Sequence, residues 1–170
     1  MDGTGNQMNI STRGLDPHRS WEFNNRKDGV ITNSDMYGYP ASHYNIPMEA
    51  VERIELVRGT GSLQYGAQFG GMLNYISKQP VTTKKVALES INTLGSYGLV
   101  STYNAVSGKT NKFRYSAWAN GKWITGYRKN SDASFDAEGV SLFYDATKNL
   151  HFKLDWTHSN YITHLPGPLT

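Results

Sequence analysis

The feature that most constrains the fold is a period-two alternation of apolar and polar residues over residues 84–160. Two stretches show it clearly, with apolar positions at Phe113, Tyr115, Ala117 and Ala119, and at Leu150, Phe152, Leu154 and Trp156. Val140, Leu142 and Tyr144 repeat it less cleanly, and Trp118 and Phe143 fall on the polar side. Alternate residues of a β-strand point to opposite faces, so this period predicts strands and excludes helices.

Turn-forming segments divide this region into about five strands, which include residues 85–93 and 98–106. Residues 107–111 and 146–149 are interpreted as hairpin turns, and residues 128–133 as a longer polar connection. Consecutive strands joined by short turns form an antiparallel meander. Each strand has about the 9–11 residues that a tilted membrane strand needs.

Alternation alone leaves two interpretations open. A soluble sheet packs its apolar row on a core, whereas an outer-membrane barrel turns that row to lipid and its polar row to the lumen. Four aromatic residues favour the membrane interpretation, because aromatic girdles mark the strand ends of membrane barrels. They are Tyr97, Trp123, Tyr127 and Tyr161.

Residues 1–80 differ in composition, with many glycines and short apolar segments. The pair Asp28-Gly29 predicts a turn before Val30, and Pro47 suits the first position of a short helix. Residues 54–58 and 73–78 are predicted strands. The expected fold class is therefore mainly β: a mixed α+β segment followed by an antiparallel β-meander.

Composition excludes several functions. Cysteine is absent, which removes disulfides and thiol catalysis, and the five histidines have no metal-ligand spacing. The net charge of +3 is too small and too scattered to indicate nucleic-acid binding. No nucleophile elbow, phosphate loop or HExxH motif is present, so we expect neither an enzyme nor a bound cofactor.

The segment Val51-Glu52-Arg53-Ile54-Glu55-Leu56-Val57-Arg58-Gly59 alternates charges around an apolar row that looks buried. It is followed by Tyr65-Gly66, Gly70-Gly71 and Asn74, and preceded by Arg13-Gly14 and Asp28-Gly29. In this order the motifs resemble the plug-domain signature of TonB-dependent outer-membrane receptors. The layout resembles most the ferric-citrate receptor type, through Arg13-Gly14-Leu15, Gln64-Tyr65-Gly66-Ala67-Gln68 and Leu165-Pro166-Gly167.

The resemblance implies that residues 1–80 are part of a plug domain and residues 84–170 the first strands of a transmembrane β-barrel. It implies a bacterial outer-membrane receptor for TonB-energised uptake of a ferric chelate, either ferric citrate or a siderophore, with lipid around the barrel. We expect the chain to be a fragment. It lacks a signal sequence and the segment that contacts TonB, and it holds five of about 22 strands.

Two sets of site residues follow from the resemblance. Charges on the strand are expected to lock the plug in a partly desolvated lumen: Glu52, Arg53, Glu55 and Arg58. Capture of an anionic, oxygen-rich chelate calls for arginine with tyrosine, histidine and glutamine as hydrogen-bond partners. The candidates, all in expected loops and turns, are Arg19, Arg26, Tyr39, His43, Gln64 and Gln68.

An alternative function is a soluble antiparallel β module that binds carbohydrate or single-stranded nucleic acid. It rests on aromatic residues near basic ones, such as Trp118 and Trp123 near Arg114 and Lys122. The same arrangement is also typical of an aromatic girdle with snorkelling basic side chains.

Overall fold

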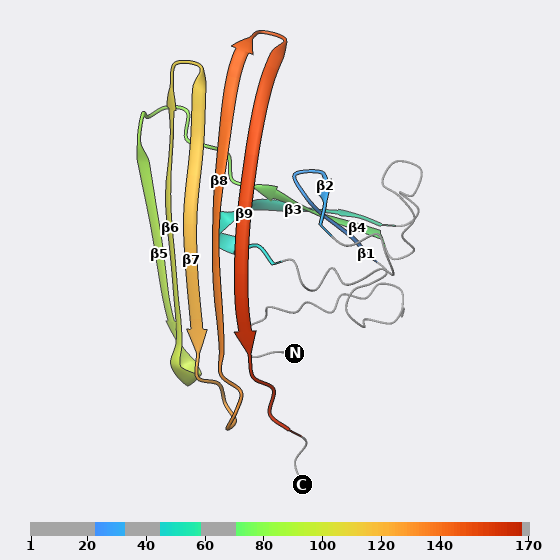
Figure 1. Ribbon diagram of the computed structural model, residues 1–170, viewed down its shortest axis with the longest axis vertical. Helices are drawn as coiled ribbons and strands as arrows, with labels where there is room; N and C mark the ends of the chain where they lie inside the picture. Colours follow the sequence, from blue (N-terminus) through green and yellow to red (C-terminus); the bar gives the residue numbers. More distant parts are fainter. Residues whose placement is uncertain (1–22, 33–44, 59–70, 168–170) are drawn as a thin grey trace. The chain divides into compact units, whose positions relative to one another are not determined.

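The computed structural model describes residues 23–32, 45–58 and 71–167 (Figure 1). The described residues divide into two compact units, one ending at Lys78 and the other beginning at Gln79. Both are built from β-strands, which confirms the mainly β fold class.

The first unit is a four-stranded sheet with the strand order β2-β1-β4-β3. β1 and β4 run parallel, while the two outer pairs are antiparallel. The strands are β1 (Phe23–Lys27), β2 (Val30–Ile31), β3 (Val51–Val57) and β4 (Gly71–Ser77). A single 3-10 turn, η3 (Met48–Ala50), follows Pro47 where a short helix is predicted.

The predicted turn at Asp28-Gly29 joins β1 to β2. Both residues have positive φ, 49° and 82°, which Gly and Asp tolerate best. Asp28 Oδ1 also accepts a hydrogen bond from the backbone N–H of Ser77 (2.9 Å), which ties the turn to β4. The expectation that Arg26 lies in a loop is wrong, because residues 23–27 pair with β4 as a strand.

Burial in this sheet centres on β1 and β4. Asn24, Met72 and Tyr75 are almost fully buried, and burial raises the pKa of the Tyr75 hydroxyl. The apolar row of β3 is different: Ile54 and Leu56 are 49% and 45% exposed. The expectation that this row is buried is therefore wrong, because β3 is the edge strand and only β4 pairs with it.

The second unit is the predicted antiparallel meander, with five strands that pair in chain order (Figure 1). Its strands are β5 (Ala87–Gly95), β6 (Leu99–Thr110), β7 (Phe113–Ile124), β8 (Ala133–Thr147) and β9 (Leu150–Thr163). A short 3-10 turn, η4 (Ser96–Gly98), connects β5 to β6.

The β6–β7 turn is shorter than predicted. The strands pair as far as Thr110 and Phe113, so only Asn111 and Lys112 form the turn. Gly108 belongs to the strand for a different reason: a Cβ there would fall on the backbone carbonyl of Lys85. Glycine at this position permits a close approach between two backbone segments rather than a bend.

The register places the predicted apolar positions of all five strands on one face. Leu88 pairs with Val106, Val106 with Ala117, Ala117 with Val140, and Val140 with Trp156. We call this the apolar face. Trp118 and Phe143, which break the alternation, lie on the opposite face; Trp118 stacks on Tyr103 there, and the Arg114 guanidinium lies 4.8 Å from the Phe143 ring centroid.

Candidate functional site

Five of the six predicted chelate-binding residues lie outside the described residues. They are Arg19, Tyr39, His43, Gln64 and Gln68. The sixth, Arg26, is in β1, where its Nε donates to Asn24 Oδ1 (3.0 Å) and its Nη1 to the carbonyl of Gly29 (2.7 Å). Two of the donors on its guanidinium therefore hold its own hairpin, while an arginine carries five in all.

The four predicted locking charges lie on β3 and just after it. Arg53 contacts both neighbouring acids, with Nη2 at 2.8 Å from Glu55 Oε1 and Nη1 at 3.5 Å from Glu52 Oε1. The side chains are about half exposed, 55% for Arg53 and 42% for Glu55. Exposed pairs of this kind contribute under about 1 kcal/mol each, so within this sheet the expected desolvation is not seen.

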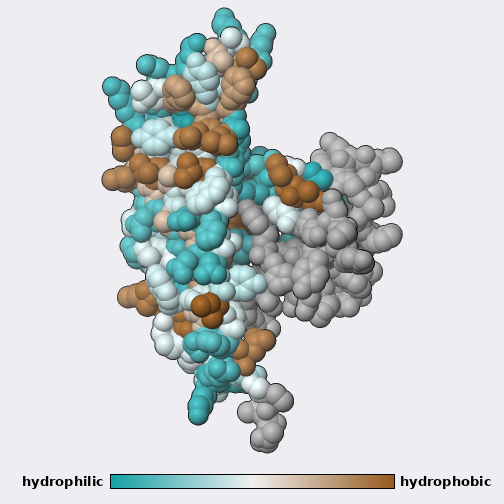
Figure 2. Space-filling model, viewed as in Figure 1, coloured by the Kyte–Doolittle hydropathy of each residue, from teal (hydrophilic) through white to brown (hydrophobic). Residues whose placement is uncertain are grey.

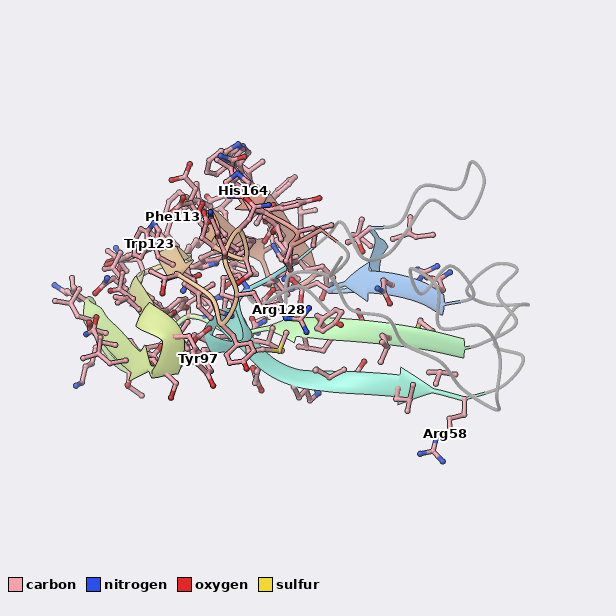
Figure 3. All side chains as sticks on the ribbon, turned by 90° about the horizontal axis from the view of Figure 1, so that it is seen from below. Arg58, Tyr97, Phe113, Trp123, Arg128 and His164 are labelled. Atoms are coloured by element: carbon pink, nitrogen blue, oxygen red, sulfur yellow. The ribbon has the colours of Figure 1, made fainter. Side chains whose placement is uncertain are left out.

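Arg58 follows the last residue of β3 and is exposed. Its side chain points away from the strands of the sheet in Figure 3. It makes no hydrogen bond or ion pair with any other residue that the structure describes. A long cation in this position is free to reach a partner outside the sheet.

Asn74, in β4, connects the charged strand to the turn of the β1–β2 hairpin. Its Oδ1 accepts from the backbone N–H of Gly29 (2.9 Å), and its Nδ2 donates to Glu55 Oε2 (3.1 Å). The side chain is buried, with 8% of the residue exposed. Buried amides need such partners, because an unsatisfied polar group costs free energy. Asn74 therefore links Glu55 in β3, and through it Arg53, to Gly29 in the turn between β1 and β2.

Sequence reasoning missed the role of Asn74. The sequence motif contains the residue, but its partners lie 45 and 19 positions away. Only the parallel pairing of β1 with β4 brings the Asp28-Gly29 turn within reach. The one available signal was a polar residue inside an otherwise apolar strand, Leu73 to Ile76.

Replacing Glu55 by glutamine is expected to weaken the sheet slightly at neutral pH and not at all in acid. The hydrogen bond from Arg53 is the main cause that holds the pKa of Glu55 below its ordinary value of 4.5, followed by the one from Asn74. Because the folded pKa is depressed, this stabilisation is present above pH 4.5 and is lost as the pH falls through the folded pKa.

Hydrogen exchange of the β3 and β4 amides, followed from pH 7 to pH 3, measures this effect. Glu49→Gln is the matched control, since Glu49 makes no ion pair with the residues that the structure describes. A difference between Glu55→Gln and the unaltered chain that persists at pH 3 would contradict the assignment.

The apolar face of the meander is exposed along its length. Large side chains between 41% and 81% exposed alternate along the strands on this face: Leu88, Leu94, Val100, Phe113, Trp123, Leu142, Leu150, Phe152, Leu154, Trp156 and Ile162. Phe113 and Trp123, near the two ends of β7, project to the same side when the sheet is viewed along its strands (Figure 3). An apolar surface of this extent indicates contact with lipid or with another protein.

Aromatic residues lie at both ends of this face, in part as predicted. Phe113 and Tyr144 stack at one end (4.6 Å between ring centroids), and neither is among the predicted girdle residues. At the other end Trp123 is on the face, and Tyr97 and Tyr127 form an edge-to-face pair in the connections. Tyr161 does not belong to this girdle, because it pairs with Phe135 on the opposite face.

The opposite face is more polar, and the buried side chains of this sheet lie on it, in the middle strands β6, β7 and β8. Tyr103 and Phe135 are 2% and 3% exposed, and Ser101 and Asn120 are also buried. One face of the sheet exposes apolar side chains, and the other carries mixed side chains that are in part buried. This difference matches the two walls of a membrane barrel. It argues against the soluble module, whose apolar row would be the enclosed one.

The end of the sheet that carries Tyr97 and Tyr127 has ordered connections. Thr125 Oγ1 donates to the carbonyl of Tyr97 (2.6 Å), and His164 Nδ1 lies 2.8 Å from Asp132 Oδ2. The hydrogen bond with His164 is the main cause that holds the pKa of Asp132 below its usual range. These contacts hold the start of the β7–β8 connection and tie the residue after β9 to that connection.

In the described part of the chain, no group of three or more His, Cys, Asp or Glu side chains is arranged to hold a metal ion. Nor does that part contain a helix that is long and apolar enough to cross a membrane.

Comparison with known proteins shows which receptors the chain is similar to. Residues 1–72 match the family model described as TonB-dependent Receptor Plug Domain. Two Pseudomonas aeruginosa proteins are similar in sequence: the ferric enterobactin receptor PirA, 34% identical over 83 residues, and a second ferric enterobactin receptor, 33% identical over 82 residues. These alignments cover 45% and 44% of this chain, but only 11% of either relative.

Solved structures share the fold. The pyoverdine outer membrane receptor FpvA from Pseudomonas aeruginosa matches over 81% of this chain and 20% of its own, with a TM-score of 0.71 and 20% identity. The siderophore receptor PirA from Acinetobacter baumannii matches over 92% of this chain and 27% of its own, with a TM-score of 0.65 and 22% identity.

These findings confirm the resemblance to TonB-dependent receptors. Residues 1–72 match plug-domain sequence, and the fold of most of the chain is like part of these solved receptor structures. The bacterial outer membrane, the predicted location, is where this class of receptor resides. Both sequence relatives are named as receptors.

Proposed function

We propose that this chain is part of an outer-membrane receptor that takes up a ferric chelate with energy delivered by TonB. The observation that carries the proposal is the plug-domain match over residues 1–72, which continues into a sheet with one exposed apolar face. Sequence similarity to two ferric enterobactin receptors supports an iron chelate as the substrate.

Within this proposal residues 1–80 are part of the plug and residues 84–170 form the first barrel strands, with lipid against the apolar face. Glu52, Arg53, Glu55 and Arg58 lock the plug. Arg53 and Glu55 do so by bracing β3, since they pair with each other and with Asn74. Arg58, exposed beyond the strand, is the locking charge suited to a partner outside the sheet.

The chelate is captured by the arginine, tyrosine, histidine and glutamine side chains named from the sequence, with Arg19 and Gln64 as the first to test. Both ferric citrate and catecholate siderophores present anionic oxygens that a planar guanidinium matches. The ferric-citrate type of motif favours the first substrate. The similarity to ferric enterobactin receptors favours the second.

Uptake of iron-55 tests the proposal. Cells that lack their own receptors would express the natural gene that contains this chain, in strains with and without TonB. We expect uptake of ferric citrate, ferric enterobactin or ferric pyoverdine, and its loss without TonB. Equal accumulation in the two strains would refute energised transport, and no accumulation of any of the three would refute the substrate class.

Single substitutions test which of the predicted residues bind the chelate. Arg19→Ala and Gln64→Ala are each expected to raise the chelate concentration for half-maximal uptake about tenfold, as the loss of one charge-assisted hydrogen bond implies. Lys148→Ala is the matched control, since Lys148 lies in the β8–β9 turn and is not among the proposed chelate-binding residues. Unchanged uptake by Arg19→Ala and Gln64→Ala would remove both residues from the site.

A further inference from the structure

A belt of polar residues crosses the apolar face of the meander. Beside the apolar row of Leu88, Val106, Val140 and Trp156, the next two rows are mostly polar. Their polar members are Ser90, Asn92, Thr102, Asn104, Asp136, Glu138, His158 and Asn160. Beyond them the face is apolar again at Leu94, Val100, Trp123 and Ile162. Figure 2 shows hydrophobic side chains gathered in bands, with polar ones between.

An apolar groove of about 620 Å³ lies on one side of this belt. The small side chains of Ala117 and Ala119 leave its floor low, while Leu88, Val106 and Trp156 stand at its sides. Carbon atoms make up most of this lining, so water finds few hydrogen-bond partners in the groove. A hydrocarbon chain fills this kind of surface best.

A second hollow of about 480 Å³ adjoins the groove, and we call it the polar ledge. The two share Asn104, Ala119 and Glu138, so one molecule can occupy both. The indole of Trp123 folds over Gly121 at the far side of the ledge, with Cζ2 3.0 Å from where a Cβ on Gly121 would stand. Trp123 thus offers an aromatic surface within the hollow.

The ledge has hydrogen-bonding capacity to spare. Asp136 and Asn160 face each other across β8 and β9, and neither side chain makes a hydrogen bond with another described residue. Glu138 lies 3.8 Å from His158, beyond hydrogen-bond distance. Carboxylate oxygens accept from hydroxyls, and the asparagine amide both donates and accepts.

The charge of the ledge selects against anions. Two carboxylates, Asp136 and Glu138, face one histidine, and neither hollow has a Lys or Arg among its described lining residues. A phosphate or carboxylate head group would be repelled. A neutral sugar fits instead, because its hydroxyls pair with carboxylates and amides and its apolar side stacks on tryptophan.

From these features we infer that the apolar groove and the polar ledge together bind a glycolipid with an uncharged sugar head group. The acyl chain lies in the groove and the sugar on the ledge against Trp123. The inference rests on the apolar face lying against lipid, which is one element of the proposed function. It does not depend on iron uptake.

Lipid titration followed by native mass spectrometry tests the inference, with the receptor in a polyoxyethylene detergent that has no sugar head group. The probes are monoglucosyl diacylglycerol and phosphatidylglycerol with the same acyl chains. We expect the glucosyl lipid to bind at least tenfold more tightly, and dodecyl maltoside to compete with it. Equal affinities, or a preference for phosphatidylglycerol, would overturn the inference.

Variants separate the two parts of the site. Asp136→Ala combined with Asn160→Ala should remove the preference for the glucosyl lipid, whereas Ser134→Ala, one row along the same face and outside both hollows, should retain it. Ala117→Leu should fill the groove and weaken the glucosyl lipid about tenfold. A retained preference in the double variant overturns the sugar contact, and unchanged binding in Ala117→Leu overturns the acyl contact.

Two further controls make the outcome unambiguous. Near-ultraviolet circular dichroism reports whether each variant keeps its tryptophan packing. Octyl glucoside alone tests a sugar-only site: if it binds as tightly as the diacyl lipid, the ligand is not a glycolipid. Failure of iron uptake with an intact lipid preference refutes the proposed transport and leaves this inference standing.

Discussion

Replacing Asn74 by alanine is expected to lower the local stability of the four-stranded sheet by about 2 kcal/mol. The substitution removes the acceptor for the Gly29 N–H and the donor to Glu55, and it does so at a buried position. The loss is larger than for a surface pair because the Gly29 N–H is left without its partner. The β1–β2 turn and β3 then lose their common anchor.

Hydrogen exchange of the Gly29 amide reads this effect directly. A loss of about 2 kcal/mol corresponds to roughly 30-fold faster exchange in Asn74→Ala. Glu55→Ala is the matched control, because it removes only the exposed partner of Asn74 and should accelerate exchange far less. Equal acceleration in both variants would show that the turn does not depend on the Asn74 amide.

Replacing Gly71 by alanine is expected to destabilise the β3–β4 pairing by about 3 kcal/mol. Gly71 begins β4 with φ at 122°, where an L side chain is strained. A Cβ there would also lie 2.5 Å from the backbone carbonyl oxygen of Val57, and a backbone atom cannot swing aside as a flexible side chain can. Strain and overlap therefore add.

Gly29→Ala separates these two causes. Gly29 has a φ of 82°, but a Cβ there meets nothing within 4 Å, so only the conformational cost applies. We expect about 1 kcal/mol for it. Exchange rates of the β3 and β4 amides measure the Gly71 effect, and those of the β1 and β2 amides the Gly29 effect. Comparable losses in the two variants would mean that the overlap with Val57 is relieved.

Much of the fold could be predicted from local patterns. The alternation around Leu154 predicts a strand and which of its residues share a face, and the register confirms both. Asp28-Gly29 predicts a turn, and Pro47 the start of a helical turn, since these preferences depend on backbone geometry alone. Such signals need no knowledge of the rest of the chain.

Predictions failed where distant segments decide the structure. Gly108 is predicted to lie in a turn, yet it lies in β6, where it pairs with Tyr115 of β7. Glycine is needed there because the Lys85 backbone passes close to it. Arg26, shortly before Asp28, is expected in a loop. It lies in β1 because β4, nearly 50 residues further along the chain, pairs with this segment. Trp118 breaks the alternation because Tyr103 on the neighbouring strand stacks with it.

The candidate site divides in the same way. Charge alternation identifies Glu52, Arg53 and Glu55 as a group, and the structure pairs them. No local pattern shows that Asn74 joins this group to the Asp28-Gly29 turn. The polar ledge was equally invisible, because Asp136 and Asn160 meet only through the register of β8 and β9.

The central claim is that the apolar face of the meander lies against lipid. A spin-label scan along β9 tests it most directly, since the chain has no cysteine and single ones can be introduced at positions 151–156. With the receptor in bilayers, labels at positions 152, 154 and 156 should be accessible to oxygen, and those at 151, 153 and 155 should not. Equal accessibility of all six positions to a water-soluble nickel complex would contradict the claim.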